Sequence, residues 1–323
     1  MSLIVQKFGG SSLADAGKLL HIAHITKAVY DVGSDVIVVV SAQGDTTDQL
    51  IRKANEISSE PRARELDALL ASGEQISAAL TAMAIESLGV PAVSLSAWQL
   101  PIRSDGVHGD ARIDRIEKER VKAELAKRRV VVVTGFQGLD GAGDVTTLGR
   151  GGSDYSAVAL AAAFGAERCL IYTDVDGVYT ADPRLCPTAK RLKRVSYEDM
   201  YALSRAGAQV LHDKCVALAQ EKGVEPEVRS CGADSAGTCI GPEGEGGAVT
   251  GVTCRENGGD PFAEITLVGK ALPSLELEKS AVLALVAAGV AVHGVDAGER
   301  SLTLHVERRY SQKALRIVHD AVI

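Results

Sequence analysis

The chain has 323 residues and a formal net charge of −7, and 46% of its residues are hydrophobic. This length and composition predict two domains with a full hydrophobic core. The negative charge, without a basic stripe of interleaved aromatic residues, argues against nucleic-acid binding.

The sequence also indicates in which cellular compartment the protein is expected. No uninterrupted apolar run reaches membrane-spanning length, and the first predicted strand follows Met1 without a signal peptide. The six cysteines lie far apart and form no CxxC pair, which is typical of reduced thiols and not of a metal site or a disulfide framework. We therefore expect a cytoplasmic protein that does not bind membranes.

Short apolar segments alternate with helical patterns along the first two thirds of the chain. Mostly β-branched segments predict strands at Leu3–Phe8, Val36–Val40, Val90–Leu95, Val130–Thr134, Cys169–Tyr172 and Glu225–Arg229. Helices are predicted at about 12–30, 46–57, 62–71, 74–88, 112–128, 154–164, 197–204 and 208–222. This alternation predicts an α/β fold, a three-layer, mainly parallel sheet with helices on both faces.

Polar, glycine-rich turns follow four of these strands, at residues 7–12, 41–48, 134–138 and 173–174. Parallel sheets bind ligands beyond the carboxyl ends of their strands, so these turns predict a binding site.

The segment from Thr147 to Asp154 is the most informative, because it places three glycines, Arg150 and an aspartate just before a helix. We expect Ser153 to cap the start of that helix and Gly165 its end. Backbone N–H groups at such a helix start bind anions, and a guanidinium group adds a fork suited to carboxylate or phosphate.

Several of these residues have simpler explanations when each is taken alone. A single lysine at a strand end, such as Lys7, is commonly just solvated, and residues 45–48 are suited to capping a helix as well as to holding a polar substrate. Glu74 is predicted in the first turn of a helix, where the macrodipole stabilises an acid whatever its function. Asp174 and Asp176 are also typical turn formers. The order of the clusters along the chain favours function.

Taken together, the motifs resemble the amino-acid kinase family and, within it, the aspartate kinases. The matching segments are residues 5–12, 40–48, 72–75, 135–138, 148–154 and 172–184, in the family's order. The Walker A and dinucleotide GxGxxG motifs are absent from the sequence, as expected for this family.

The resemblance implies transfer of the ATP γ-phosphoryl group to the side-chain carboxylate of L-aspartate. A carboxylate is already nucleophilic at neutral pH, so the enzyme must position two anions and neutralise their charge. On the family pattern Lys7 and Asp154 are catalytic. Lys7 offsets charge on the transferring phosphoryl group, and Asp154 organises Lys7.

The same pattern implies the binding residues. It implies that Arg150 binds the α-carboxylate of the substrate and Glu74 binds its α-ammonium group. Thr46 and Ser153 are expected to orient the substrate. The residues expected to hold ATP and its phosphates, besides Lys7, are Gly9, Gly10, Ser11, Thr173, Asp174, Tyr179, Arg184 and Gln209. Mg²⁺ is expected to bridge phosphate oxygens with few protein ligands, and no protein metal site is predicted.

The chain departs from the family at the nucleotide site. Gln209 stands where the family usually has a lysine in Gly-Ala-Lys-Val-Leu. The glutamine amide can still donate a hydrogen bond, but the positive charge of the lysine is absent. We expect weaker use of ATP. Lys214, in an altered segment that follows, is a candidate to supply the missing charge.

The second departure is in the C-terminal region. Residues 1–232 are predicted as the catalytic domain and 233–261 as a Gly-rich connector, with a possible edge strand at Ala248–Cys254. A strand, a helix, two strands and a helix then resemble a single small α+β ACT-like domain over 262–323; they are predicted at Phe262–Val268, Glu276–Ala288, Val290–Val295, Ser301–Val306 and Ser311–Val322.

Aspartate kinases usually carry two ACT domains, whose paired interface binds lysine or threonine. A single such domain, with residues 270–274 replacing the usual Pro-Gly turn, predicts weak or absent feedback inhibition. We expect it to be a dimerisation module, because exposed sheet edges pair readily, and so expect a homodimer or a higher homo-oligomer.

Two other functions stay open at this point. A kinase acting on acetylglutamate, glutamate, carbamate or UMP would share the fold, although Glu74 and Arg150 favour a free α-amino acid. A catalytically weak regulatory or scaffolding partner is the second alternative. Gln209 favours it, whereas Lys7 and Asp154 count against it.

Overall fold

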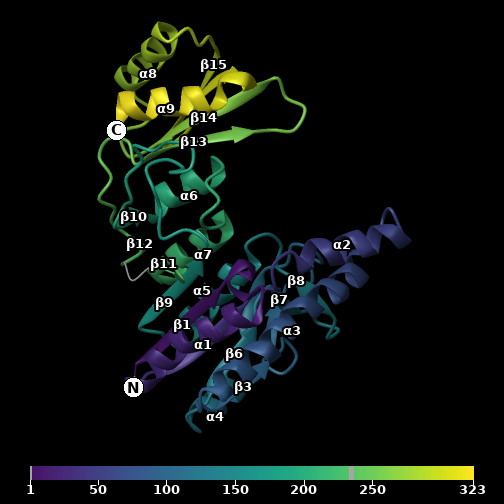
Figure 1. The fold of residues 1–323 in the computed structure, drawn as a ribbon. Coiled ribbons are helices and arrows are strands. Elements are labelled where there is room, and N and C mark those ends of the chain that lie inside the picture. The colour runs from purple at the N-terminus through teal and green to yellow at the C-terminus, as the bar shows by residue number, and fades with distance from the viewer. Residues whose placement is uncertain (1, 233–235) are drawn as a thin grey trace. The chain divides into compact units, whose positions relative to one another are not determined.

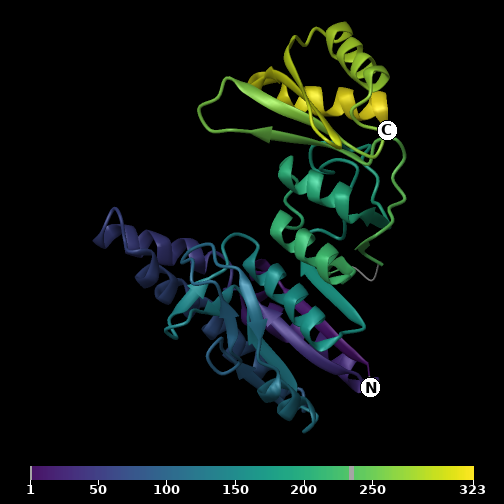
Figure 2. The same ribbon diagram turned by 180° about the vertical axis from the view of Figure 1, so that it is seen from behind.

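The computed structural model describes residues 2–232 and 236–323, and the chain forms two compact units (Figures 1 and 2). The first unit comprises residues 1–176 and 221–234, and the second comprises 177–220 and 235–323. Sequence motifs predict a different division, at 1–232, 233–261 and 262–323, which stays a prediction; residues 233–235 of that connector lie outside the described residues. The two divisions differ because residues 177–220 carry kinase motifs yet pack with the C-terminal segment.

The first unit is built on a parallel sheet with the strand order β11-β9-β1-β2-β6-β3. Its strands are β1 (Leu3–Phe8), β2 (Asp35–Val40), β3 (Ala92–Leu95), β6 (Val130–Thr134), β9 (Arg168–Thr173) and β11 (Pro226–Ser230). All six predicted strands are confirmed to within two residues at each end. Because Val36 to Val40 are buried on both faces of the sheet, their run is continuously apolar rather than alternating.

Helices pack against both faces of this sheet. The helices that contact its strands are α1 (Ala16–Asp31), α3 (Ala63–Ser87), α4 (Glu119–Leu125) and α5 (Gly152–Phe164), and α2 (Thr46–Ile57) packs against α3. α1 and α3 share one hydrophobic cluster with Val36, Val38 and Val40. α5 contacts β1, β2 and β9, where the intervening side chains Ile37 and Val39 are buried on the other face.

Helix α3 corrects the prediction of two helices at 62–71 and 74–88, because it runs unbroken through Ser72 and Gly73. Gly73 serves close packing, since a Cβ there would lie 2.8 Å from the Cβ of Ala42. Glu74 therefore lies in mid-helix, so the predicted stabilisation by a helix N-terminus does not apply.

By length and mean hydropathy (1.3 over an 18-residue window), α3 passes a composition test for a membrane span, and 56% of that window is buried inside the structure. A core helix passes the same test, and α3 shares the hydrophobic cluster of the sheet.

A smaller sheet in the first unit was not predicted. Its order is β5-β4-β7-β8, with β4 (Ile102–Ser104), β5 (Ile113–Ile116), β7 (Gln137–Leu139) and β8 (Val145–Thr147). The predicted helix at 112–128 is wrong over its first part, where β5 pairs antiparallel with β4, and only Glu119–Leu125 is helical. Non-local strand pairing outweighed a local helical pattern here.

The second unit contains α6 (Tyr197–Arg205), most of α7 (Asp213–Lys222) and the parallel strands β10 (Arg194–Ser196) and β12 (Thr238–Gly241). α7 begins later than the predicted residue 208, because Gly207, with φ of +105°, lies in a turn after α6. β12 was not predicted in the connector.

The rest of the second unit is an antiparallel sheet in the order β13-β14-β16-β15, with two helices. Its elements are β13 (Gly251–Glu256), β14 (Phe262–Val268), α8 (Leu275–Ala287), β15 (Val292–Ala297), β16 (Ser301–Glu307), a short 3₁₀ helix (Arg308–Tyr310) and α9 (Ser311–Val322). The expected edge strand at 248–254 is present but lies at Gly251–Glu256. Leu302, Leu304 and Val306 join α8 and α9 in one core, and the alternating residues of β16 face the other way.

Candidate functional site

The first unit has a cavity of about 560 Å³ beside the carboxyl ends of β1 and β2, between residues of α3 and the start of α5. It brings together many of the predicted site residues, namely Lys7, Gly10, Glu74, Arg150, Ser153 and Asp154. Thr47 and Asp48 line it, whereas the predicted Thr46 starts α2 and lies near Gly73, whose Cβ would be 3.5 Å from the Thr46 methyl carbon.

Lys7 and Asp154 form an ion pair inside this cavity, with 2.6 Å between Lys7 Nζ and Asp154 Oδ1. Both side chains are largely buried. Lys7 lies on β1 and Asp154 in the first turn of α5, where the helix N-terminus favours a negative charge. The pair therefore holds an ammonium group at a fixed position inside the cavity.

The turn after β1 requires glycine. A Cβ at Gly10 would lie 2.4 Å from the carbonyl oxygen of Ala42, so no larger residue fits. The N–H of Gly9 donates to the carbonyl oxygen of Tyr172 at 3.1 Å, so this predicted phosphate donor is already used. Gly10 and the exposed Ser11 begin a 3₁₀ helix, whose first amides are free of helical partners by geometry.

The helix start at α5 differs from the prediction. The N-cap is Gly151, with φ of +67°, and α5 begins at Gly152, so Ser153 lies in the first turn instead of capping the helix. A left-handed N-cap favours glycine. Close packing requires glycine at the next residue, since a Cβ at Gly152 would lie 2.8 Å from Cδ2 of Phe136, and also at Gly135, where a Cβ would lie 2.8 Å from Ser153. Gly165 ends the helix in a left-handed conformation, as predicted. Arg150 is exposed at the rim of the cavity.

Glu74 is the most unusual group in the cavity. It is 3% exposed, and its Oε1 accepts the N–H of Ala42 at 2.9 Å. Its Oε2 has no hydrogen-bond partner among the residues that the structure describes. Burial raises the pKa of Glu74 to about 7. A buried carboxylate with an unused oxygen is suited to receive a cation from a ligand.

Asp67 was missed by the sequence reasoning. It is 1% exposed and lies two helical turns before Glu74 on α3. Its carboxylate accepts hydrogen bonds from His108 Nδ1 (2.8 Å), Gly109 N (2.9 Å), Thr147 N (3.0 Å) and Thr147 Oγ1 (2.6 Å). It thereby fixes the loop that leads into Arg150. The seven-residue spacing of two acids in an apolar helix was the available signal, and dividing α3 in two hid it.

The predicted nucleotide residues are divided between the units. Thr173 ends β9, and its hydroxyl donates to Asp174 at 3.0 Å in the first unit. Tyr179, Arg184 and Gln209 belong to the second unit. There, Arg184 forms an ion pair with Asp182, and Gln209 is exposed in the turn between α6 and α7.

Comparison with known proteins identifies the family of the chain. The model of the amino acid kinase family matches residues 2–230. An aspartokinase of Geobacillus stearothermophilus is 48% identical over 243 residues, which are 75% of this chain and 60% of that protein. The chain thus spans about 60% of the length of the curated relatives that it matches.

Solved structures are similar over nearly the whole chain. Aspartate kinase from Synechocystis matches with a TM-score of 0.67 and 28% identity over 99% of this chain and 69% of that one. E. coli aspartokinase III in complex with aspartate and ADP matches with a TM-score of 0.86 over 99% of both chains, at 20% identity, which is a likeness of fold. Since the family model covers more than half of the chain, including the cavity and its ion pair, the chain belongs to the amino acid kinase family.

Proposed function

We propose that the chain transfers the γ-phosphoryl group of ATP to the side-chain carboxylate of L-aspartate, which gives 4-phospho-L-aspartate and ADP. The observation that carries this proposal is the unused carboxylate oxygen of Glu74 in one cavity with Arg150 and the Lys7–Asp154 pair. An acid and an arginine suit the two charged groups of a free α-amino acid. The names of the relatives, which are aspartokinases, support the choice of aspartate.

In the proposed reaction a carboxylate oxygen of aspartate attacks the γ-phosphorus. The bond from that phosphorus to the bridging oxygen breaks, and its electron pair leaves with ADP. Lys7, held by Asp154, neutralises charge on the phosphoryl group as it transfers. Glu74 binds the α-ammonium group and Arg150 the α-carboxylate, so that the side chain of the substrate points toward Lys7.

Mg²⁺, where it accompanies the nucleotide, would neutralise part of the negative charge of the phosphate groups. Among the described residues, the one group of three close ligand atoms from His, Cys, Asp or Glu is Cys186, His319 and Asp320, in the second unit. None of these lines the cavity. On the family resemblance, Mg²⁺ is proposed to arrive with the nucleotide, and the sequence prediction that it has few protein ligands stays a prediction.

The test is an ATP-dependent hydroxamate assay, in which hydroxylamine traps the acyl phosphate as a coloured product. We expect colour that requires both ATP and L-aspartate and is lost in Lys7→Ala. N-acetylglutamate, glutamate and UMP serve as competing substrates, with UMP measured by ADP release. Turnover of one of these without turnover of aspartate would replace the proposal with another kinase. A folded protein without any turnover would favour the scaffolding alternative.

The antiparallel sheet with α8 and α9 is proposed to be an ACT-like dimerisation module. β15 lies at an edge of this sheet, and Leu275, Leu283 and Val286 form an exposed apolar stripe on α8, with Leu283 67% exposed. We expect a homodimer by analytical ultracentrifugation and a monomer for Leu283→Asp. An unchanged mass for that variant would contradict this surface.

Feedback inhibition is proposed to be weak, because residues 270–274 replace the usual turn before α8, where Ser274 caps the helix. Addition of lysine or threonine to the hydroxamate assay should leave the rate unchanged, and tight calorimetric binding of either at α8 would contradict this. We also propose a cytoplasmic enzyme, which localisation of a tagged chain would test.

A further inference from the structure

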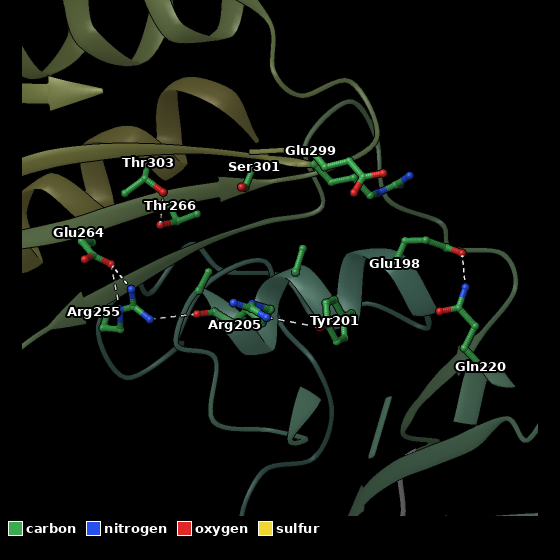
Figure 3. A pocket seen from close by; sticks show the side chains of 13 residues that line it. Glu198, Tyr201, Arg205, Gln220, Arg255, Glu264, Thr266, Glu299, Ser301 and Thr303 are labelled. Atoms are coloured by element: carbon green, nitrogen blue, oxygen red, sulfur yellow. Dashed lines mark hydrogen bonds and ion pairs between the residues drawn. The ribbon is translucent and has the colours of Figure 1, made fainter. Parts of the chain in front are cut away.

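The second unit holds a cluster of metal-ligating side chains, formed by Cys186, His319 and Asp320. One ligand atom of each residue, which is a sulfur, a ring nitrogen or a carboxylate oxygen, lies within 4.8 Å of the other two. None of the three residues lines the catalytic cavity. None lines the second cavity either, which has about 440 Å³ and lies between α6 and the antiparallel sheet (Figure 3).

Two segments that are distant in sequence bring this cluster together. Cys186 lies in a turn, where its N–H donates to the carbonyl oxygen of Asp182 at 2.8 Å and its own carbonyl oxygen accepts the N–H of Ala189 at 3.1 Å. His319 and Asp320 lie near the end of α9. The cysteine and the apolar face of α9 belong to one hydrophobic core, so the fold itself sets the distances between the ligands.

The cluster extends from the core to the surface. Cys186 is fully buried and His319 is 2% exposed, whereas the side chain of Asp320 is 57% exposed. Two ligand atoms therefore lie in a dry interior, and the third faces the solvent. This arrangement gives an ion a path into the cluster and gives a water molecule access as a fourth ligand, which is how zinc sites with three protein ligands are completed.

A single hydroxyl group lies among the three ligand atoms. Thr188 Oγ1 is 3.3 Å from Cys186 Sγ, 3.3 Å from His319 Nδ1 and 2.7 Å from Asp320 Oδ1. The hydroxyl has one proton, so it can donate to only one of these atoms, and the short contact assigns that proton to Asp320. A cation, by contrast, accepts a lone pair from all three atoms at once.

The imidazole of His319 is also held from its other side. Its Nε2 lies 2.9 Å from Thr180 Oγ1, and the same oxygen accepts the N–H of Lys190 at 2.9 Å. Histidines that bind metals commonly donate their second ring N–H to such a partner, which fixes the tautomer and the orientation of the ring. Thr180 therefore supports Nδ1 as the nitrogen that faces Cys186 and Asp320.

We propose that Cys186, His319 and Asp320 bind one Zn²⁺ ion. A thiolate, an imidazole and a carboxylate form a ligand set that suits zinc and does not suit Mg²⁺ or Ca²⁺, which prefer oxygen. On binding, the thiol of Cys186 gives its proton to solvent as the sulfur–zinc bond forms, and no electron is transferred. Tetrahedral zinc holds its ligand atoms about 3.3–3.8 Å apart, so the three atoms need to approach one another by about 1 Å.

The bound ion links the last helix of the chain to the turn that contains Cys186. Arg184, which is one of the predicted nucleotide residues, lies in the same turn, and Arg316 of α9 donates to the carbonyl oxygen of Leu185. Zinc therefore adds a cross-link where α9 already contacts this turn. Its binding stabilises the second unit and does not depend on the proposed kinase activity.

Metal titration of the whole chain, after removal of metal with EDTA, tests the proposal. We expect one equivalent of Zn²⁺ to bind by isothermal titration calorimetry, with release of a proton. Co²⁺ in place of Zn²⁺ should give the near-ultraviolet charge-transfer band of a thiolate–cobalt bond. Absence of this band in the folded wild-type chain would overturn the proposal.

Variants assign the ligands. Cys186→Ser should abolish the cobalt band, and both Cys186→Ser and His319→Gln should weaken zinc binding about a hundredfold or more. The controls are Cys254→Ser, at a half-buried cysteine of the same unit, and His305→Gln, which removes a histidine paired with Asp296 at 2.7 Å. Both controls should keep the band and the affinity.

A further variant serves if the buried substitutions do not fold. Asp320→Asn changes an exposed side chain and should weaken zinc binding about tenfold. Zinc that binds Cys186→Ser, or Asp320→Asn where Cys186→Ser does not fold, as tightly as it binds the wild type would be adventitious binding to other thiols and would overturn the assignment.

Thermal unfolding provides a readout of the cross-link. Zinc should raise the melting temperature of the wild-type chain by about 5 °C and leave that of Cys186→Ser unchanged, because only the folded cluster presents the three ligands together. An equal rise in both proteins would contradict the cross-link. These measurements need neither nucleotide nor turnover, so a failure of the kinase proposal and a failure of the zinc proposal are distinguishable.

Discussion

The two cavities differ in how deeply their charged side chains are buried and in how many hydrogen-bond partners those side chains have. In the first unit Asp67 and Glu74 are both buried on α3, yet Asp67 accepts four hydrogen bonds and Glu74 accepts one with an oxygen left over. The second unit has a cavity of about 440 Å³ between α6 and the antiparallel sheet, and the charged residues Arg205 and Glu299 that line it are exposed.

An unpaired charge costs little in water and much when buried. The orphan oxygen of Glu74 is therefore strong grounds for a ligand, whereas the exposed charges of Arg205 and Glu299 are stable in water without one. Substitutions at the first cavity should accordingly have the larger effects.

The largest effect is expected for Lys7→Ala. Loss of the ammonium group that Asp154 holds at 2.6 Å should lower kcat by about a thousandfold, because a preorganised charge at the reacting group is removed. Steady-state kinetics with aspartate and ATP measure this. Lys27→Ala, in a surface pair on α1, is the control and should behave as wild type. A Lys7→Ala variant with normal kcat would remove the basis for placing phosphoryl transfer here.

Arg150→Ala should raise the KM for aspartate about a hundredfold and change kcat much less. The expected loss corresponds to one charge-assisted, bidentate interaction with the α-carboxylate. The exposed Arg115→Ala is the matched control. If the KM for ATP rises instead, Arg150 serves the nucleotide and the assignment of the substrate end is wrong.

Asp67→Asn should raise the KM for aspartate about tenfold and also lower the free energy of unfolding by about 2 kcal/mol. The new amide group would face the N–H donors of Gly109 and Thr147, so at least one hydrogen bond is lost. Asp114→Asn, on the exposed side of β5, is the control. Lower stability with an unchanged KM would make Asp67 a purely structural residue and not one that positions Arg150.

The pH dependence of aspartate binding sharpens the role of Glu74. Because burial raises its pKa to about 7, the carboxyl group is neutral below that pH and cannot pair with an ammonium group. Below pH 7 the KM for aspartate should increase as the pH falls, by up to about tenfold for each pH unit, and above pH 7 it should be nearly constant. Glu74→Gln should have a high KM with no such dependence. A wild-type KM that is flat between pH 5.5 and 8 would argue against contact between Glu74 and the substrate.

The raised pKa of Glu74 also affects the stability of the ligand-free protein, but in the opposite direction: low pH favours folding, whereas it weakens aspartate binding. The folded-state pKa of Glu74 lies above its ordinary value of 4.5, so its contribution to stability is present below pH 4.5 and is lost as pH rises through about 7. Glu74→Gln should therefore unfold at a higher temperature than wild type at pH 8. Aspartate should reverse the order by stabilising only the wild type.

The smallest effect is expected for Lys214→Ala, which tests whether this residue compensates for Gln209. The KM for ATP should rise about threefold, in keeping with one partly exposed charge. Lys279→Ala on α8 is the control. Equal effects of the two substitutions would exclude compensation by Lys214.

Local sequence pattern predicted the strands of the parallel sheet well, because a β-branched run between glycine-rich turns has few alternatives. It failed at residues 112–118, where β5 exists only by pairing with β4. It also failed at Ser72 and Gly73, since a glycine that packs against Ala42 looks the same in sequence as one that ends a helix.

The sequence by itself determined the family, the parallel sheet and the side chains Lys7, Glu74, Arg150 and Asp154, because these lie in ordered motifs at strand and helix ends. Only the tertiary structure decided that Glu74 keeps an unpaired oxygen, that Asp67 anchors the loop before Arg150, and that a second polar cavity lies against α6. Hydrogen-bond partners and burial depend on segments distant in sequence, so no local pattern contains them.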